Sequence, residues 1–362
     1  MRPHDDNERP PIIFNDYMNC LMGDSNEENV AALLEPVAKT GAEYFVTDAG
    51  WYADDSTWWD DVGLWEPSQK RFPSGFNVLL DKIRSKGLIP GLWLEPEVGG
   101  VRSIVASRLP KEALFQWCGR RIVGKDTFQL DHRHLKFDYN IEVTQYTGID
   151  GSFSAGAAHL EHQRAYLVWQ MDHSMLSVHS LQSTSDQQDP ALYAAIAAAL
   201  PTAVVLEQSA TWAYPQPGWS DELNTFTVVN SLLRRVYLSG RLDKLSPDQL
   251  RLVVEGMNVY KRIRLHLKST HPIWPLGFPQ WHDDRLALAL ITQDNGIYFA
   301  VWRTGGTTDK DLPVKLAEGQ ALTTAKMLYP TRPNTKAMCN TTSGVLSLKP
   351  PNTVCARLFH VI

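Results

Sequence analysis

Short apolar runs alternate with longer amphipathic stretches along the first two thirds of this chain. The short runs are mostly apolar, as is typical of strands buried on both faces of a sheet. A regular alternation of strands and helices predicts a parallel sheet with right-handed crossovers. Seven such strands fit either an open sheet or most of an eight-stranded barrel. The seven runs are Ile12–Tyr17, Glu43–Ala49, Leu88–Glu95, His134–Asn140, Leu181–Gln187, Ala203–Ser209 and Arg235–Gly240.

Local start and stop signals predict helices between these runs. Each predicted start is a Ser or Asp that can cap the first turn of a helix. Three of these four residues are followed by Pro at the next position, by Glu or Gln three residues later, or by both. A glycine marks the end of the first two helices, and the last helix is expected to run to about Lys268. The predicted starts are Ser25, Ser74, Asp189 and Ser246, and the two glycines are Gly41 and Gly87.

The pattern changes near residue 282, where β-type runs follow one another across Gly, Pro and Asn turns without an intervening helix. This arrangement predicts a small antiparallel β-sandwich. We therefore expect an N-terminal extension over residues 1–10, an α/β domain over residues 11–281 and a β domain over residues 282–362. The β-type runs are Leu286–Thr292, Ile297–Trp302, Ala321–Tyr329, Val345–Lys349 and Val354–Ile362.

Composition and charge narrow the class of protein. The chain has 362 residues, of which 43% are hydrophobic and 21% charged, a balance that excludes disordered, collagenous and coiled-coil chains. Its net charge of −5 argues against a nucleic-acid partner held by bulk electrostatics. No apolar run approaches the roughly 18 residues that a membrane span needs, and the polar start of the chain lacks the core of a signal peptide. We therefore expect a cytoplasmic protein with no membrane partner.

One predicted strand presents an alternation that suits catalysis. Lys136, Asp138 and Asn140 point to one side, whereas Phe137 and Tyr139 point to the other. A neighbouring cation favours the ionised form of Asp138, which a nucleophile requires. The alternative is a structural Lys–Asp pair at the rim of a barrel.

Two further carboxylates end predicted strands, where a parallel barrel places its reactive groups. Asp186 closes a polar run, whereas Asp189 fits the helix cap. Asp48 precedes a Gly turn and the pair Trp51–Tyr52, and a carboxylate beside an aromatic ring suits a sugar, since the ring stacks on C–H faces. Either aspartate could instead cap a turn, and Trp51 could be a core residue.

Other polar groups carry weaker signals. Glu95 and Glu97 flank a proline at a strand end and could bind a metal or hydroxyl groups, although a salt-bridged structural role is the simpler interpretation. His132 and His134 form an HxH pair without a matched ligand set. The four cysteines form no CxxC pair, so neither a disulfide framework nor a zinc site is expected. The chain contains no GxGxxG, Walker or GxSxG motif.

Several of these motifs, in this order, resemble glycoside hydrolase family 36, the α-galactosidase-type enzymes. The most specific is the Lys-aromatic-Asp-x-Asn motif, and the resemblance extends over about residues 10–362. The matching segments are Asp48–Tyr52, Gly63–Trp65, Leu92–Glu97, Lys136–Asn140, Ser185–Asp186, the segment beginning at Tyr214 and the stretch Val229–Arg264.

The resemblance implies a (β/α)8 barrel of the TIM type, here with seven recognisable strands, that cleaves terminal α-galactosides such as melibiose and raffinose-type oligosaccharides by a retaining double displacement. It implies Asp138 as the nucleophile and Asp186 as the acid/base. It also implies substrate-binding roles for a further set of residues, with no metal or organic cofactor and no partner beyond a small carbohydrate, and it leaves a homo-oligomer open. The substrate-binding set is Asp48, Trp51, Trp65, Lys136, Asn140, Asp54 and Asp55.

The chain also departs from the family pattern. The family's Gly-rich segment between the two catalytic motifs is absent from this sequence. Where it would be expected, Trp169 is followed directly by Gln170. Two other functions therefore stand beside the hydrolase: a non-catalytic galactoside-binding remnant, and an aberrantly shortened gene product that cannot close its barrel. Within the family, a transglycosylase or an α-N-acetylgalactosaminidase would differ only in its acceptor or in pocket details.

Overall fold

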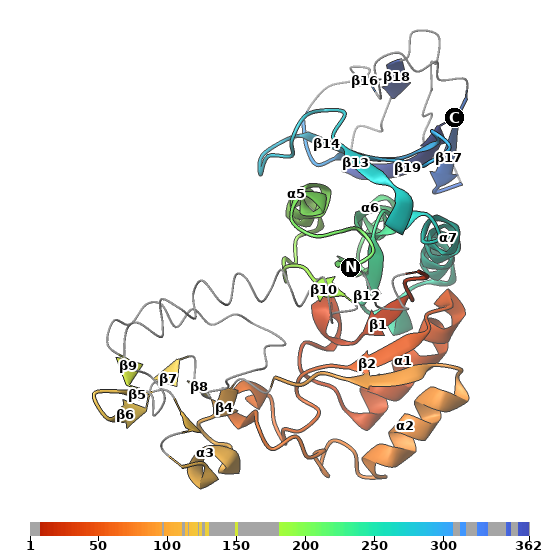
Figure 1. Cartoon of the computed structure of the whole chain (residues 1–362). Helices are drawn as coiled ribbons and strands as arrows, with labels where there is room; N and C mark the ends of the chain where they lie inside the picture. The colour runs from red at the N-terminus through yellow and green to blue at the C-terminus, as the bar shows by residue number, and fades with distance from the viewer. Residues whose placement is uncertain are drawn as a thin grey trace.

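The computed structural model of the chain describes residues 8–95, 98–110, 113–114, 116–121, 123–124, 127–129, 149–150, 181–306, 312–315, 324–331, 345–348 and 354–361. Two sheets dominate these ranges, one parallel and one antiparallel. Helices α5, α6 and α7 lie between the two sheets, and the small strands β4 to β9 lie to one side (Figure 1). No helix in the described ranges is both long and apolar enough to cross a membrane.

The parallel sheet has six strands in the order β10-β11-β12-β1-β2-β3, and every neighbouring pair is parallel. The predicted α/β class is therefore confirmed. The chain crosses from β3 to β10, which stand at opposite edges of this sheet. The strands are Ile13–Asn15 (β1), Tyr44–Thr47 (β2), Ile89–Leu92 (β3), Gln182–Ser183 (β10), Ser209–Ala213 (β11) and Arg235–Leu238 (β12).

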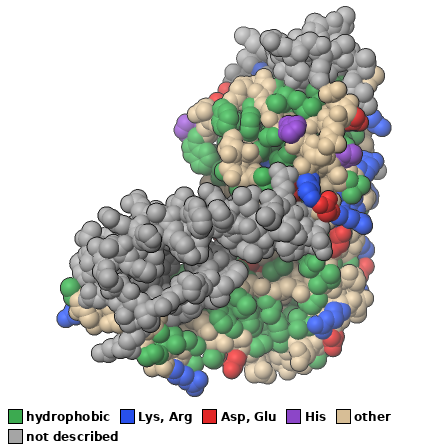
Figure 2. Space-filling model, in the orientation of Figure 1, with side chains coloured by type: hydrophobic (Ala, Val, Ile, Leu, Met, Phe, Trp, Pro, Cys, Tyr) green, Lys and Arg blue, Asp and Glu red, His purple; other side chains and the backbone are tan. Residues whose placement is uncertain are grey.

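Strand β3 pairs only with β2 among the described strands. Three large apolar side chains in or next to it, those of Ile89, Leu92 and Leu94, are 51%, 40% and 46% exposed. Figure 2 shows hydrophobic side chains gathered on the lower part of the molecular face that it displays. The predicted strand His134–Asn140 lies outside the described residues, so closure into a barrel stays a prediction.

In the part of the chain that the structure describes, five helices of ten or more residues pack against the two sheets. Two predicted starts are confirmed: Asp189 accepts from two backbone N–H groups of α5, and Ser246 with Gln249 forms the capping box of α7. The first helix begins one residue later than predicted, with Asn26 as its cap, because the Ser25 hydroxyl donates to Asp16 instead. The helices are Glu27–Thr40 (α1), Phe76–Ser85 (α2), Pro190–Ala199 (α5), Asp221–Leu232 (α6) and Pro247–Ile263 (α7).

Two other expectations about the helical region are corrected. The second helix starts after Gly75 rather than at Ser74, whose N–H donates to Glu27, and the last helix ends at Ile263, before a separate short turn. The predicted strand over residues 203–209 is wrong: Val205 accepts from the N–H groups of two following residues in a turn. The strand lies at β11, whose small buried residues carry a weaker apolar signal.

Short strands and one short helix fill the described part of the connection between β3 and β10. They form two small antiparallel sheets, β4-β8-β7 and β6-β5-β9. None of these strands was predicted from the sequence. The elements are Val98–Gly100 (β4), Ile104–Arg108 (α3), Gln116–Trp117 (β5), Arg120–Arg121 (β6), Val123–Gly124 (β7), Thr127–Gln129 (β8) and Ile149–Asp150 (β9).

The C-terminal sheet is antiparallel with the order β13-β14-β15-β19-β17, and β16 pairs separately with β18. All five β-type runs predicted here coincide with strands, whereas β13 and β16 were not predicted. The predicted division of the chain into domains stays a prediction. The strands are His271–Ile273 (β13), Arg285–Ile291 (β14), Ile297–Arg303 (β15), Leu312–Lys315 (β16), Ala325–Tyr329 (β17), Val345–Leu348 (β18) and Cys355–Val361 (β19).

Strand alternation explains how the antiparallel sheet packs. Leu286, Leu288 and Leu290 of β14 join the large core around the parallel sheet and its helices, whereas Ala287 and Ala289 belong to a second core on the opposite face. One face of the sheet therefore continues the main core, as a period of two predicts.

A buried ion pair joins the antiparallel sheet to helix α6. Arg357 in β19 is 3% exposed and donates to both oxygens of Glu222 in α6, each at 2.8 Å. We expect Glu222→Ala to lower the free energy of unfolding by about 3 kcal/mol, because it leaves a buried guanidinium without these two acceptors. Glu222→Gln keeps one acceptor and should lose less. Urea unfolding followed by tryptophan fluorescence measures both, and equal losses would contradict the role of the pair.

Candidate active site

The carboxyl ends of β1 and β2 bring polar groups together at one edge of the parallel sheet. Asn15 and Asp48 stand at the ends of these neighbouring strands, which pair in parallel register. The Asn15 side-chain amide donates to Asp48 Oδ2 at 2.5 Å and to the Tyr237 hydroxyl at 3.0 Å. Asp48 is 8% exposed. The predicted candidate Asp48 therefore lies in a polar layer, which we call the polar floor, formed by Asn15, Asp16, Asp48 and Tyr237.

Asp16 supports this floor from a fully buried position. Its Oδ1 accepts from the Asp48 N–H at 2.7 Å, and its Oδ2 accepts from the Ser25 hydroxyl at 2.9 Å. Burial, assisted by the nearby Asp48 carboxylate, raises the pKa of Asp16 to about 8. A carboxyl group with such a pKa holds its proton at neutral pH, so Asp16 fixes the start of the loop after β2 largely as a neutral acid.

Aromatic rings stand beside the polar floor, and we call Tyr52, Trp58, Trp65 and Trp93 the aromatic wall. Tyr52 contacts Trp65 edge-on with centroids 5.0 Å apart and stacks on Trp93 at 6.4 Å. Trp51 is only 2% exposed, and its indole N–H donates to the Trp93 carbonyl at 3.0 Å. Trp51 thus belongs to the core behind the wall, whereas Trp65 and Trp93 are partly exposed.

Backbone strain marks one position in the wall. Trp65 has a φ of +55°, which is rare for a bulky side chain and persists only where the surroundings fix it. Ring contacts with Trp51, Tyr52 and Trp93 supply that support. Such strain is common at ligand sites, so Trp65 is the strongest candidate in the wall for contact with a ligand.

Asp186 lies beyond β10, on an exposed loop that two buried tyrosines anchor. Tyr193 donates to the Thr184 carbonyl at 2.9 Å, and Tyr214 donates to the Gln187 carbonyl at 2.8 Å. These bonds hold the loop on both sides of Asp186, which is exposed. An accessible carboxyl group on a rigid support is what proton transfer to a bound ligand requires.

The predicted residues Lys136, Asp138 and Asn140 lie outside the described residues, as does Glu97. Glu95 is described and is 1% exposed, so it lies in the interior next to the wall. No cluster of His, Cys, Asp or Glu in the described ranges could hold a metal ion.

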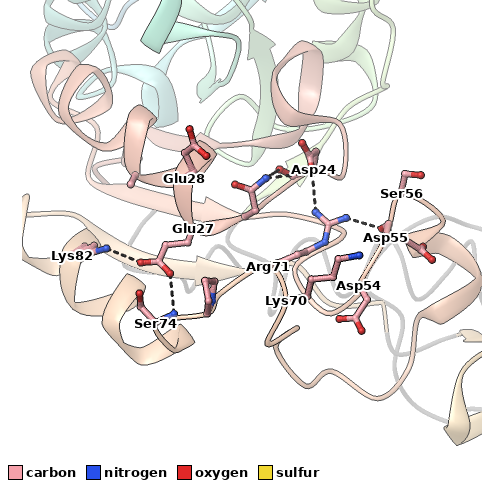
Figure 3. A pocket seen from close by; sticks show the side chains of 13 residues that line it. Asp24, Glu27, Glu28, Asp54, Asp55, Ser56, Lys70, Arg71, Ser74 and Lys82 are labelled. Atoms are coloured by element: carbon pink, nitrogen blue, oxygen red, sulfur yellow. Dashed lines mark hydrogen bonds and ion pairs between the residues drawn. The ribbon is translucent and has the colours of Figure 1, made fainter.

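Asp54 and Asp55 line a separate open pocket of about 730 Å³, together with Asp24, Lys70 and Arg71 (Figure 3). Asp54 accepts from Ser68 at 2.6 Å. Asp55 accepts from Arg102 and Thr57, and these hydrogen bonds hold the pKa of its carboxyl group below its ordinary value. Both aspartates therefore already have protein partners.

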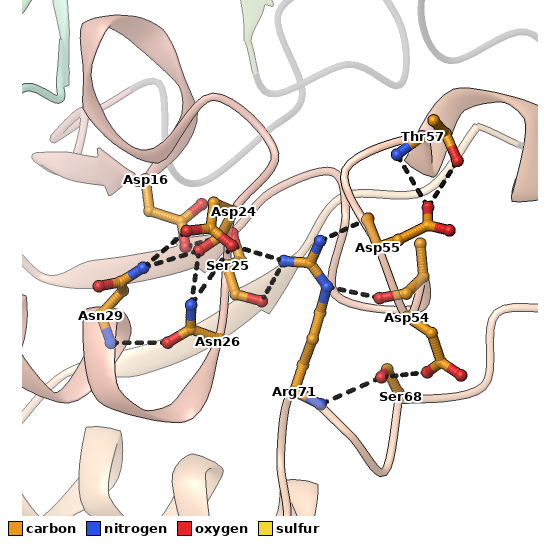
Figure 4. A network of polar contacts seen from close by, with 11 residues as sticks. Asp16, Asp24, Ser25, Asn26, Asn29, Asp54, Asp55, Thr57, Ser68 and Arg71 are labelled. Carbon is orange, nitrogen blue, oxygen red and sulfur yellow. Dashed lines mark hydrogen bonds and ion pairs between the residues drawn. The ribbon is translucent and has the colours of Figure 1, made fainter.

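Arg71 is the centre of the polar network beside this pocket (Figure 4). Its guanidinium donates to the carbonyls of Ala53, Ser25 and Asp55 and to the Asp24 carboxylate. The side chain is buried, so this network ties the loop after β1 to the loop after β2. The two loops that carry Asp16 and Asp48 are thereby held in one arrangement.

Some residues of the site were not predicted from the sequence. Asn15 and Asp16 end the first apolar run, so the rule that selected Asp48 could have selected them. Tyr237 and Arg102 carried no comparable signal, because their importance depends on contacts across the fold.

Comparison with protein families and curated proteins gives a consistent result. The Melibiase family model matches residues 1–209. α-Galactosidase Mel36A of Lactobacillus acidophilus is 25% identical over 184 residues, which is 51% of this chain and 24% of that protein. α-Galactosidase AgaA of Geobacillus stearothermophilus is 30% identical over 139 residues, which is 38% of this chain and 19% of that protein. The chain thus matches about a quarter or less of the length of these relatives.

Solved structures share the fold over nearly the whole chain. A variant of AgaA in complex with 1-deoxygalactonojirimycin aligns with a TM-score of 0.74 at 15% identity, covering 98% of this chain and 56% of that one. The α-galactosidase from Lactobacillus brevis aligns with a TM-score of 0.73 at 16% identity, covering 99% and 56%. Other variants of AgaA were solved with raffinose and with stachyose. The chain spans just over half the length of these structures.

Proposed function

Because this chain belongs to the Melibiase family, we propose that it is a retaining glycoside hydrolase that cleaves terminal α-galactosides. The family membership and the α-galactosidase relatives support the reaction class. The raffinose and stachyose bound to AgaA variants support α-galactosyl oligosaccharides as the substrate class. In this proposal the six parallel strands are part of an eight-stranded barrel within residues 11–281, and residues 282–362 form a supporting β domain.

The juxtaposition of the polar floor and the aromatic wall carries the proposal. Asp48 offers an acceptor for sugar hydroxyl groups, and the Asn15 amide holds this carboxylate in place. Trp65 and Trp93 offer partly exposed ring faces, against which the C–H groups of a pyranose can pack. Apolar ring faces next to a few fixed polar groups are typical of the lining of a small-ligand site.

The proposed mechanism uses two carboxyl groups. Asp138 attacks the anomeric carbon while Asp186 protonates the departing glycosidic oxygen, which gives a covalent galactosyl-enzyme. Asp186 then removes a proton from the incoming water, and the anomeric carbon returns to its original configuration. This sequence requires the two carboxyl groups to stand about 5–5.5 Å apart.

Substrate binding in the same proposal falls to the residues implied by the family motifs. Lys136 favours the ionised nucleophile and holds hydroxyl groups with Asp48 and Asn140. Trp65 lines the sugar, while Trp51 supports the wall from the core. Asp54 and Asp55 contribute through the loop after β2, where they already bind Ser68 and Arg102.

The decisive experiment is hydrolysis of an aryl α-galactoside, with the anomer of the first product followed by NMR. We expect release of α-galactose before mutarotation, as retention requires. The Asp138→Ala chain gives the background rate, and a parent chain no faster than this variant would refute the hydrolase. Release of β-galactose would refute the double displacement.

The absence of the Gly-rich segment from the sequence favours a second candidate, a galactoside-binding protein without turnover. The polar floor and the wall would still suffice for binding. Calorimetry with galactose decides between the two when hydrolysis is measured on the same preparation. Binding without hydrolysis supports this second candidate, and the absence of both removes it.

A further inference from the structure

The loop after β2 is clamped to the strand that follows β3. We call residues 54–62 the clamped segment, which includes the short helical turn Trp58–Asp61. Two backbone hydrogen bonds of 2.8 Å join it to the neighbouring chain: Gly100 N–H donates to the Val62 carbonyl, and Arg102 N–H donates to the Asp60 carbonyl. A Cβ at Gly100 would fall 2.0 Å from the Asp60 carbonyl oxygen. This close approach requires glycine at position 100.

The Arg102 side chain strengthens the clamp at both ends of the segment. Its guanidinium contacts Asp55 through two nitrogens, at 3.1 and 3.2 Å. The same group contacts Asp61 at 2.6 Å and Asp60 at 3.0 Å, and it donates to the Thr57 carbonyl at 3.2 Å. A planar guanidinium can make several directed bonds at once, which a lysine ammonium cannot do in this geometry.

The clamped segment carries one ring of the aromatic wall into place. Trp58 contacts Trp93 edge-on at 6.0 Å and Tyr17 edge-on at 6.0 Å. A Cβ at Gly23 would fall 2.1 Å from the Trp58 ring nitrogen, so Trp58 packs closely over the loop after β1. Trp58 therefore bridges the end of β3 and the loop after β1, beside the polar floor.

Charge explains why the clamp needs a cation. Asp55, Asp60 and Asp61 converge on Arg102, and like charges at this spacing repel one another without it. One of these acids, Asp61, also acts on the wall: burial, followed by the charges of Asp48, Glu95 and Asp61, raises the pKa of Tyr52. Loss of Arg102 would thus both loosen the segment and add negative potential beside the floor.

We propose that Arg102 is a positioning residue, which holds the clamped segment so that Trp58 completes the aromatic wall of the candidate sugar site. In this proposal Arg102 acts through the position of Trp58 rather than directly on the substrate. The part of this inference that concerns the sugar rests on the proposed function. The part that concerns the position of Trp58 depends only on the contacts described above.

The substrate test compares Arg102→Ala and Arg102→Lys with the parent chain. We expect Arg102→Ala to raise KM for an aryl α-galactoside about 10-fold and to lower kcat by a smaller factor, because displaced binding groups weaken productive binding. Arg102→Lys should recover part of the loss in KM. Arg84→Ala is the matched control, since Arg84 forms an exposed pair with Asp81 in α2, remote from the wall. Unchanged KM in Arg102→Ala would overturn the proposal.

A second readout needs no substrate. Acrylamide quenching of tryptophan fluorescence in Arg102→Ala should increase relative to the parent, and the increase should disappear when Trp58→Phe is added. If the parent neither binds nor cleaves galactosides, the proposed function fails, and quenching alone decides the role of Arg102. Quenching equal to that of the parent overturns that role. Should Arg102→Ala fail to fold, Arg102→Gln is measured in the same way.

Discussion

We expect Asp186→Ala to slow the hydrolysis of a galactoside with a sugar leaving group by about 10²- to 10⁴-fold, the range typical of general acid catalysis. The reason lies in the proposed first step, in which the departing oxygen needs a proton. A dinitrophenyl galactoside releases a stable anion and needs no such proton. Its first step should therefore remain fast in the variant, and the covalent galactosyl-enzyme should accumulate.

Azide sharpens this prediction because it attacks the galactosyl-enzyme without help from a base. We expect azide to restore turnover of the dinitrophenyl substrate in Asp186→Ala and to yield α-galactosyl azide. Asp138→Ala, which lacks the nucleophile, should lose activity on both substrates alike, and any azide product should have the β configuration. Equal losses on the two substrates in Asp186→Ala would contradict the acid/base role.

A control carboxylate stands three residues further along the same loop. Asp189 accepts from the N–H groups of Ala191 and Leu192 as the cap of α5. Its replacement by alanine should cost about 1 kcal/mol of stability without a change in the dependence on the leaving group. Rates are compared well below the melting transition of each variant. If Asp189→Ala reproduced the substrate pattern of Asp186→Ala, the effect would belong to the loop rather than to its acid.

The elements that could be predicted from the sequence are those whose signals are local. The capping box at Ser246 and the proline after Asp189 each determine a helix start within a few residues. Runs of β-type residues between Gly, Pro and Asn turns likewise predicted β14, β15 and β19 closely. The prediction failed at residues 203–209, because an apolar run by itself cannot distinguish a buried turn from a strand.

In the candidate site, too, the residues with a local sequence signal could be predicted and the contacts between distant residues could not. Asp48 could be selected because it ends an apolar strand and precedes a glycine, whereas the bond from Asn15 to Tyr237 joins residues 222 positions apart. The role of Trp51 was ambiguous from sequence, since a buried tryptophan and a ligand-stacking tryptophan have the same local pattern. Burial of the ring at 2% exposure assigns it to the core. Contacts at long sequence separation are what the local pattern lacked.

Asp16 gives the largest expected effect on stability, and the effect depends on pH. The pKa of its carboxyl group rises from the ordinary 3.8 to about 8 on folding. The folded chain therefore keeps a proton that the unfolded chain releases. This group does not reduce the free energy of unfolding below about pH 4, and it reduces that free energy increasingly as the pH rises toward 8. At and above pH 8 the loss attributable to this group is about 5 kcal/mol.

We therefore expect Asp16→Asn to be more stable than the parent chain at pH 8, with an advantage that shrinks by about 3–4 kcal/mol on going to pH 5. Asparagine imitates the protonated acid: its oxygen accepts from the Asp48 N–H, and its amide faces the Ser25 hydroxyl oxygen, which in Asp16→Asn accepts a hydrogen bond instead of donating one. Urea unfolding of both chains at the two pH values gives the difference, because all other groups titrate equally in both.

Asp81→Asn, at an exposed position of α2, should show no such trend. A constant difference between Asp16→Asn and the parent would show that Asp16 is ionised in the folded chain, and Asp48 would then stand beside a second buried negative charge.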